Sequence, residues 1–428
     1  MVKKFKIIFQ NKEINNATWI IGQQIFQMLL QLVVGVLTAR YLGPRNFGAL
    51  NYTASFVTFF TSIATLGMDG VVVKSLIDNP DKEDVIIGST MGLRTISSIL
   101  SMISVFVLVA VLNPQEKIKW ILVFLQSFQL LFRAIQIMDS WFQRHLKSKY
   151  VSIGKMGSCI VVSLYKIVLL VTAKDIVWFA FSNSLTDAVI MIIEYWFYIK
   201  EGGKRPRFSL EVGIGILKNS YHFIISGIMV AIYSQMDRVM IGQMMSDLDV
   251  GLYTTATAIC SMWTFVPNAI ITSLEPNIMV LKKRGDEEAY LRKLKQLYSI
   301  IIWLCIGVSV VVAVGAKIFI YILYGKAYIG ATNTLRIAIW FETFAMIGNA
   351  RGVWILCENK NKYVKYYLGI GAVVNLVLNM ILIPALGING AAIATLVTQF
   401  VTSLIAPLLF RETREFPKIV LDAFGFRW

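Results

Sequence analysis

Apolar stretches of about 20 residues follow one another along the whole chain, separated by short polar connections. A helix of that length crosses the hydrocarbon core of a bilayer, so each stretch predicts one transmembrane helix. The pattern predicts an all-α integral membrane protein with two six-helix lobes. The twelve stretches lie at 17–38, 47–67, 86–111, 120–140, 151–172, 176–199, 219–242, 250–274, 296–322, 331–356, 364–384 and 389–410.

The Lys and Arg residues fall mainly in alternate connections between these stretches. With the N-terminus in the cytoplasm, the inner connections carry 27 of them and the outer connections carry 6. The positive-inside rule therefore predicts cytoplasmic N- and C-termini and an even number of helices. The basic N-terminal segment leads directly into the first stretch without a small-residue cleavage pattern, so we expect no cleavable signal peptide.

Composition excludes several classes of protein. A hydrophobic content of 57% is too high for a soluble protein. The net charge of +16 sits on short loops beside apolar helices, where anionic lipid headgroups rather than nucleic acid account for it. The four cysteines lie inside predicted helices without metal-ligand spacing, and no connection has room for a soluble catalytic domain. We therefore expect a protein that is not an enzyme and has no metal, cofactor or nucleic-acid partner.

The chain divides at its middle into two related halves. A basic segment at 201–215 separates an N-lobe (1–200) from a C-lobe (216–428). The sequence that begins at Phe47 (FGALNYTA) resembles the one that begins at Val250 (VGLYTTA), about 203 residues later. Both copies start on the outer side of the membrane, so the pattern indicates a parallel repeat whose halves enclose a central site.

Polar residues recur at helical spacing on predicted helices 1, 2, 7 and 8. Such stripes avoid lipid, because an unpaired polar group in hydrocarbon is costly. Packing between helices explains one stripe, whereas four stripes in equivalent positions favour a shared water-filled cavity that binds a glycan. Its expected lining is Gln23, Gln27, Gln31, Asn51, Ser55, Thr58, Ser62, His222, Ser226, Tyr233, Thr257 and Ser261.

Charged residues also lie inside predicted helices, where each costs roughly 2.5–3.5 kcal/mol on insertion scales. Salt bridges account for some of them. The acids Asp187, Asp237 and Glu342 are candidates for coupling to H⁺ or Na⁺, whereas Asp139 and Glu194 near inner ends are expected to snorkel. The excess of cations favours an anion site, for which arginine suits phosphate. The candidate cations are Arg94, Arg133, Lys166, Arg238, Arg336 and Arg351.

Four segments, in order and spacing, resemble the Wzx-type O-antigen and capsular polysaccharide repeat-unit flippases. This family belongs to the polysaccharide transport branch of the MOP superfamily, which also holds multidrug (MATE) exporters and lipid II flippases. The segments are ARYLGPRNFGALNYTAS (39–55), MDRVMIGQMMSDLDVGLYTTATAI (236–259), LYGKAYIGATNTLRI (323–337) and GIGAVVNLVLNMILIPALGINGAAIATLVTQF (369–400).

The resemblance implies a MATE-like, V-shaped transporter in the bacterial cytoplasmic (inner) membrane. Its implied substrate is an undecaprenyl-pyrophosphate-linked oligosaccharide, moved from the inner to the outer leaflet by alternating access and coupled to an ion gradient. It implies membrane lipids, a polysaccharide polymerase and a chain-length regulator as partners. It also adds Lys74 to the anion site, since this residue stands where family members carry a basic residue, usually arginine, after the glycine-rich end of helix 2.

Three alternatives remain open. A multidrug exporter shares the architecture, but its cavity is usually acidic to suit cations. A lipid II flippase moves a similar carrier. A membrane polymerase or ligase needs a sizeable outer loop with catalytic residues, and the outer loops here are short.

Overall fold

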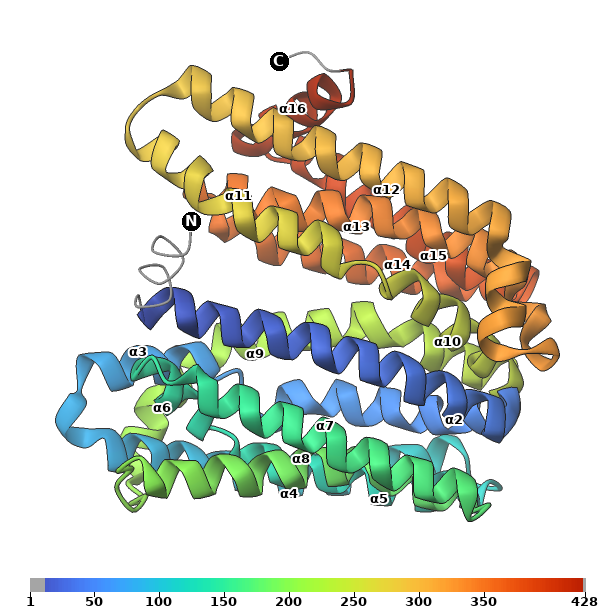
Figure 1. The fold of residues 1–428 in the computed structure, drawn as a ribbon, viewed down its shortest axis with the longest axis horizontal. Coiled ribbons are helices and arrows are strands. Elements are labelled where there is room, and N and C mark those ends of the chain that lie inside the picture. The colour runs from blue at the N-terminus through green and yellow to red at the C-terminus, as the bar shows by residue number, and fades with distance from the viewer. Residues whose placement is uncertain (1–11, 426–428) are drawn as a thin grey trace, which may run out of the picture. The chain divides into compact units, whose positions relative to one another are not determined.

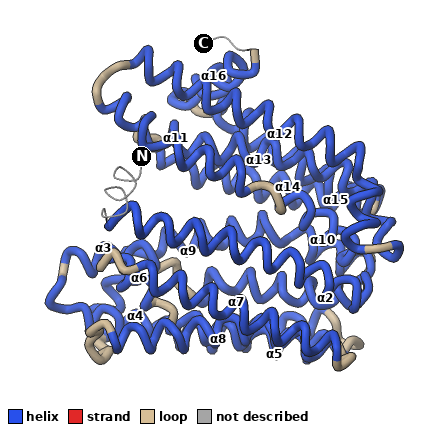
Figure 2. The backbone as a smooth tube through the Cα atoms, in the orientation of Figure 1, coloured by secondary structure: helices blue, strands red, loops and turns tan. Residues whose placement is uncertain are grey.

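The computed structural model describes residues 12–425, and the basic segment before residue 12 lies outside the described residues. This part of the chain is helical and contains no strand (Figure 1; Figure 2). The main helices are α2 (Lys12–Ala64), α3 (Asp69–Asp78), α4 (Glu83–Leu112), α5 (Lys117–Ile135), α6 (Met138–Arg144), α7 (Ser148–Val171), α8 (Ile176–Lys200), α9 (Leu210–Met244), α10 (Asp247–Ser261), α11 (Phe265–Lys283), α12 (Glu287–Tyr324), α13 (Thr332–Cys357), α14 (Val364–Leu386), α15 (Ile388–Phe400) and α16 (Glu415–Phe424).

The described residues contain 10 helical segments that are long and apolar enough to cross a membrane. One of them, Gly22–Asp78, has 57 residues and is long enough for two crossings. Helix α13 has 26 residues, which also suffices, although its arginines and glutamate lower its hydropathy. These two cases raise the ten segments to the twelve predicted crossings, and the all-α membrane fold is confirmed.

The helices form two compact units. The first, here the N-unit, comprises Met1–Leu42 and Ala49–Ala231, and the second, the C-unit, comprises Gly43–Gly48 and Ile232–Trp428. These bounds differ from those of the predicted lobes, because the predicted linker and α9 as far as Ala231 pack with the N-unit. The chain therefore passes between the units inside α2 and inside α9.

Helix α2 is two helices joined at a sharp bend. Gly43 has φ 70° and ψ 168°, a backbone conformation that side chains rarely tolerate. Pro44 follows and cannot donate to the preceding turn. This pair ends the first predicted membrane helix and starts the second, so the sequence boundary between them is correct.

The residues just after this bend pack very closely on α10 within the C-unit. A Cβ added at Gly48 would lie 1.6 Å from the carbonyl oxygen of Asp247, and one added at Gly251 would lie 2.0 Å from that of Pro44. Gly48 and Gly251 are the two glycines that the internal repeat aligns. They allow the two backbones to touch, as small residues do at helix contacts in membranes.

Predicted helix 8 is also interrupted. Helix α10 ends at Ser261 and α11 begins at Phe265, with a turn between them. Pro267 lies in the first turn of α11, where its missing N–H costs nothing, and its ring disfavours helical continuity with the preceding turn. The structure therefore divides the predicted helix at 250–274 into two helices near Pro267.

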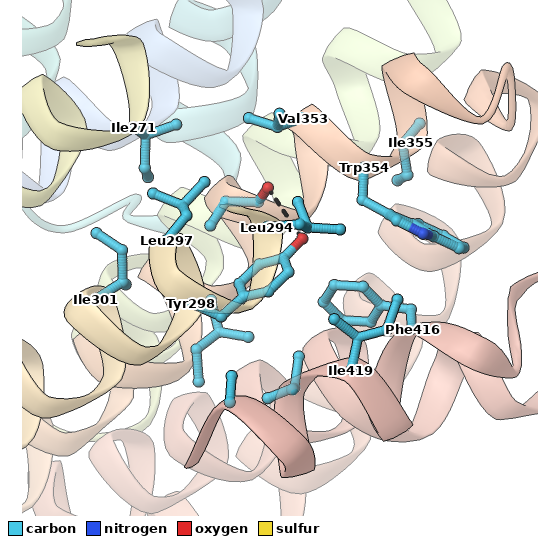
Figure 3. Packing of buried hydrophobic residues seen from close by; sticks show 14 of the residues in the cluster. Ile271, Leu294, Leu297, Tyr298, Ile301, Val353, Trp354, Ile355, Phe416 and Ile419 are labelled. Carbon is cyan, nitrogen blue, oxygen red and sulfur yellow. Dashed lines mark hydrogen bonds between the residues drawn. The ribbon is translucent and has the colours of Figure 1, made fainter. Parts of the chain in front are cut away.

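The C-unit has a dense aromatic core that holds the C-terminal helix (Figure 3). Tyr298 of α12 donates to the carbonyl oxygen of Ala350 at 3.3 Å. Its ring packs edge-on against Phe416 of α16, and Trp354 of α13 lies on the other side of Phe416. Helix α16 is thus fixed to α12 and α13 by its apolar face.

In the N-unit, the segment that follows α8 is fastened to the start of α4. The Arg207 side chain donates to the Asp84 carboxylate, and the Arg207 N–H donates to the Asp84 carbonyl oxygen at 3.0 Å. A Cβ at Gly88 would lie 2.4 Å from the Arg207 carbonyl oxygen, so glycine permits this contact.

At the end of α8, hydrogen bonds from Lys147 and Tyr150 lower the pKa of the Glu201 carboxyl.

We predict that Gly251→Ala destabilises the protein, because the new methyl group would collide with the backbone at Pro44. Overpacking of this kind costs about 1–3 kcal/mol, so the apparent Tm of the purified protein in detergent should fall. Gly352→Ala is the matched control, since a Cβ there meets nothing within 4 Å. An unchanged Tm in Gly251→Ala would contradict the close contact.

Candidate functional site

The N-unit contains a polar cavity of about 560 Å³ between α2, α5, α7 and α8. Each helix contributes one stripe at helical spacing, so the lining follows directly from the sequence of each helix. The lining residues are Gln27, Gln31, Val34, Gly35, Gln129, Arg133, Gln136, Lys155, Cys159, Val162, Ser163, Lys166, Asn183, Thr186, Asp187 and Ile190. Three of these are cations and one is an acid, so the cavity is electropositive.

Arg133 and Asp187 form the central ion pair of this cavity. The Arg133 Nε lies 3.2 Å from both carboxylate oxygens of Asp187, which is buried. Gln136 donates to the same carboxylate at 3.0 Å and to the Asp187 carbonyl oxygen at 3.0 Å. Because both bonds of Arg133 use Nε, its two terminal nitrogens are left to donate to a ligand in the cavity, and such a fork suits two phosphate oxygens.

Two lysines of α7 add to this positive charge. Lys155 and Lys166 are eleven residues apart, which is close to three helical turns and places both on the cavity face. The Lys155 ammonium group lies 3.3 Å from the Asp139 carboxylate. Lys166 has no carboxylate within salt-bridge distance among the described residues. The cavity therefore holds one ammonium group, that of Lys166, without a carboxylate partner among the described residues.

Carboxamides supply most of the neutral polar lining. Gln27 donates to the Lys155 carbonyl oxygen at 3.1 Å and lies beside Gln31 on α2. Gln129 and Asn183 line the cavity from α5 and α8. Amides both donate and accept, so this surface can bind sugar hydroxyl groups next to the cations.

A second pocket of about 410 Å³ adjoins the cavity at Lys155 and lies nearer the N-terminal end of α2. Gln23, Asp139 and Gln143 are among its lining residues, and Lys155 lines both spaces. Gln143 donates to Asp139 at 3.0 Å. The Lys155 side chain is thus the boundary between the two pockets.

Of the seven cations predicted for an anion site, this cavity brings together Arg133 and Lys166. Arg94 lies elsewhere in the N-unit and is committed to Asp69 at 2.7 Å, with only 2% of its side chain exposed. Lys74 is exposed on α3 and does not line either N-unit pocket. Arg94 therefore has a structural ion pair instead of a free guanidinium.

The other three predicted cations belong to the C-unit. Arg238 is held by Gln235 at 3.1 Å, and Arg336 is exposed and donates to Asn333 at 3.3 Å. Arg351 lines a pocket of about 260 Å³ and donates to the Thr402 carbonyl oxygen at 2.6 Å. The six cations inside predicted helices thus divide between structural contacts and separate pockets.

Arg351 donates its hydrogen bond to the backbone at a point where the helix type changes. Residues Val401–Ile405 (η4) form a π-helical turn after α15, which leaves carbonyl groups without the usual α-helical partners. The Arg351 guanidinium also lies 4.4 Å from the Tyr367 ring centroid, and Tyr233 lines the same pocket. Arg351 therefore stabilises this turn as well as lining the pocket.

The hydroxyl stripes of α2 and of α10 bond mainly to their own helices. Ser55, Thr58 and Thr257 each donate to a carbonyl oxygen three or four residues earlier, as do Ser226 and Ser261. Ser62 instead donates to the Gly227 carbonyl oxygen at 3.1 Å. Asn51 and His222 line neither the electropositive cavity, nor its adjoining pocket, nor the Arg351 pocket of the C-unit. From the predicted glycan lining, only Gln27 and Gln31 reach the electropositive cavity, Gln23 reaches the adjoining pocket and Tyr233 reaches the C-unit pocket.

The predicted coupling acids have three different environments. Asp187 is paired with Arg133 in the N-unit. Asp237, buried in the C-unit, accepts hydrogen bonds from Asn375 at 3.1 Å, Asn379 at 2.6 Å, Thr395 at 2.6 Å and the Tyr253 hydroxyl. Glu342 on α13 is 9% exposed.

Sequence reasoning missed several lining residues of the cavity. Lys155 lies inside a predicted helix but was not among the candidate cations, and Gln129, Gln136 and Asn183 were not assigned to a stripe. A signal existed, because Gln129, Arg133 and Gln136 are spaced by four and three residues, as on one helical face. Glu194 was also misjudged: it is 1% exposed and so does not snorkel.

Comparison with known proteins identifies the family. Residues 14–282, more than half of the chain, match the family described as "Polysaccharide biosynthesis protein". The chain is also 22% identical over 416 residues to the "Probable flippase AglR" of Haloferax volcanii, which covers 93% of this chain and 82% of that protein.

Solved structures show the same fold. The lipid II flippase MurJ, in an inward closed conformation, has a TM-score of 0.75 at 15% identity, with 95% of this chain and 90% of MurJ covered. An inward-facing multidrug resistance MATE family transporter of the MOP superfamily has a TM-score of 0.65 at 14% identity, with 92% and 95% covered. A MOP superfamily transporter from Pyrococcus furiosus has a TM-score of 0.65 at 10% identity, with 96% of each chain covered.

These similarities confirm the multi-pass membrane architecture and the MATE-like fold predicted from the sequence. The family match covers the first eight predicted membrane helices, including all four helices that line the electropositive cavity. The chain belongs to the polysaccharide biosynthesis protein family and has the fold of the MOP superfamily transporters.

Proposed function

We propose that this protein is a flippase that moves an undecaprenyl-pyrophosphate-linked oligosaccharide from the inner to the outer leaflet of the bacterial cytoplasmic membrane. Family membership and the likeness to the probable flippase AglR support a lipid-linked saccharide as the substrate class. The lipid tail stays in the bilayer while the polar head group crosses through the protein by alternating access. No bond is made or broken, so the protein needs binding groups and no catalytic residue.

The observation that carries this proposal is the electropositive cavity of the N-unit. Arg133 and Lys166 supply cations for the diphosphate, and Gln27, Gln31 and Asn183 supply donors and acceptors for the adjoining sugar. The volume of about 560 Å³ lies in the usual range of ligand sites, roughly 300–1,000 Å³.

The same observation counts against a multidrug exporter for cationic drugs. The acid of the lining, Asp187, is already paired with Arg133, so the cavity repels a cationic ligand. A lipid II flippase would use a similar carrier, and only the glycan separates it from the proposed function. A membrane polymerase would need catalytic groups on a large outer loop, and the outer connections are short.

Ion-gradient coupling is part of the proposal, with Asp237 as its principal site in the C-unit. Two hydroxyl groups and two side-chain amides surround its carboxylate, and the oxygen atoms of these groups can also coordinate a cation. Intramembrane acids commonly mark ion pathways. Asp187 and Glu342 are secondary candidates, and the coupling ion is H⁺ or Na⁺.

The remaining assignments follow from the sequence. The excess of Lys and Arg on one side supports cytoplasmic N- and C-termini. A polysaccharide polymerase and a chain-length regulator are proposed partners, because flipped repeat units must be joined into chains on the outer face.

We predict that the purified protein, reconstituted in vesicles, equilibrates a fluorescent undecaprenyl-pyrophosphate oligosaccharide between the leaflets. A glycosidase added outside should then cleave the whole pool, whereas in protein-free vesicles it should cleave the outer-leaflet fraction alone. In cells, loss of the gene should leave lipid-linked repeat units on the inner leaflet. Single repeat units on the outer face of such cells would indicate a polymerase and contradict the proposal.

We predict that Lys166→Ala weakens binding of the pyrophosphate-linked substrate by about tenfold or more, because a hydrogen bond to a charged group contributes about 1.5–3 kcal/mol. Lys166→Arg should retain most of the affinity, and high salt should reduce the difference between wild type and variant. The matched control is Lys174→Ala, which removes an exposed lysine of the same unit. Equal affinities in wild type and Lys166→Ala, measured by isothermal titration calorimetry, would remove Lys166 from the anion site.

We predict that Asp237→Asn abolishes the dependence of flipping on an imposed ion gradient but leaves substrate affinity within about threefold of wild type, since Asp237 and the electropositive cavity belong to different units. The measurement is the vesicle assay with a pH or Na⁺ gradient of either direction. Gradient dependence that survives in Asp237→Asn would shift the coupling role to another acid.

A further inference from the structure

Glu194 of α8 is a carboxyl group enclosed in the N-unit without a hydrogen-bond donor. Glu194 is 1% exposed and its Oε2 is fully enclosed. Neither carboxyl oxygen accepts a hydrogen bond from the described residues. The backbone of α7 covers it at Gly154, where an added Cβ would lie 3.5 Å from the Glu194 Cγ. A carboxylate in such a place is strongly disfavoured, whereas a neutral carboxylic acid is tolerated.

The charged groups around Glu194 do not neutralise it as the structure stands. Asp139 of α6, Lys155 of α7 and Asp187 of α8 are the ionisable groups that act on it electrostatically. Lys155 is 3.3 Å from Asp139, and Asp187 is paired with Arg133 of α5. The nearby cations are therefore already paired with other acids, and the charges of Asp139 and Asp187 oppose a further negative charge at Glu194.

Lys155 connects Glu194 to the electropositive cavity. Lys155 lines both the electropositive cavity and the second pocket, and its side chain is 35% exposed, so its ammonium group has room to move. Glu194 lies on the same stripe of α8 as Asp187 and Ile190, which line the electropositive cavity. A negative charge at Glu194 would compete with Asp139 and with any anion in the cavity for this lysine.

We propose that Glu194 is a proton-binding residue whose protonation controls Lys155 and thereby the anion affinity of the N-unit cavity. With the proton bound, Lys155 stays paired with Asp139 at the cavity boundary and attracts an anion. When Glu194 releases its proton to solvent, its carboxylate draws the Lys155 ammonium group away from the cavity. Proton and anion therefore bind with positive cooperativity, and each raises the affinity of the other.

Proton binding at Glu194 stands independently of the proposed function, and only its link to anion affinity rests on that function. The direct test is infrared spectroscopy of the full-length protein in detergent. We expect a carbonyl band of a protonated carboxylic acid at neutral pH that Glu194→Gln lacks. Glu211→Gln, which changes an exposed carboxyl of α9, is the control and should leave the band unchanged. Identical protonated-acid bands in wild type and Glu194→Gln would overturn the proposal.

The second arm measures affinity for inorganic pyrophosphate by isothermal titration calorimetry between about pH 6 and pH 9. In wild type the affinity should fall by about tenfold as the infrared band disappears, which is within the usual range of coupling between sites. In Glu194→Gln, which imitates the protonated acid, the affinity should stay high across this range. The same pH dependence in both proteins would refute the control of Lys155.

A third variant keeps the test decisive if Glu194→Gln does not fold. In Lys155→Met, the cation that favours the Glu194 carboxylate is absent, so the infrared band should persist to higher pH than in wild type. A band that titrates identically in Lys155→Met and wild type would overturn the link between the two residues. Absence of any pyrophosphate binding, with the infrared result as expected, would instead count against the proposed anion site and leave the proton site intact.

Discussion

The cost of placing charge within a membrane governs this structure. Each intramembrane cation must be paired, hydrogen-bonded to backbone or hydrated, and the described residues give examples of the first two. Arg94 is paired with Asp69, and Arg351 donates to the Thr402 carbonyl oxygen. Arg133 is paired through one edge only, beside a polar cavity that it shares with Lys166. The cations with unused donors therefore identify where a charged ligand can bind.

The two units contain different chemistry. The N-unit cavity has an excess of cations and several carboxamides, which suit a diphosphate and its adjoining sugar. The C-unit instead encloses the Asp237 carboxylate with four donors and keeps Arg351 at a π-helical turn. If substrate binds mainly to one unit and the coupling ion mainly to the other, the chain segments in α2 and α9 that pass between the units are covalent connections through which the two events can be linked.

Much of the fold was predictable, because hydrophobic length and loop charge are direct physical requirements of a membrane. The helix boundary at Gly43 and Pro44 could be read from the sequence for the same reason. Partners inside the membrane could not be predicted. Arg94 and Arg133 look alike in sequence, yet the first is committed to Asp69 and the second faces a cavity, and this difference depends on which helices pack together. The hydroxyl stripes could not identify the cavity for a related reason. Ser and Thr hydroxyl groups in a helix donate to carbonyl oxygens of the same helix, as those of Thr58 and Thr257 do. Their spacing alone therefore does not show that they line a cavity.

The central claim is that the N-unit cavity binds the diphosphate of a lipid-linked oligosaccharide. A cryo-electron microscopy structure with that substrate bound tests it most directly. The account predicts phosphate density within hydrogen-bonding distance of the Arg133 terminal nitrogens and the Lys166 ammonium group, with sugar density beside Gln27 and Gln31. Phosphate density at Arg351 or Arg238 in the C-unit, with the N-unit cavity empty, would contradict it.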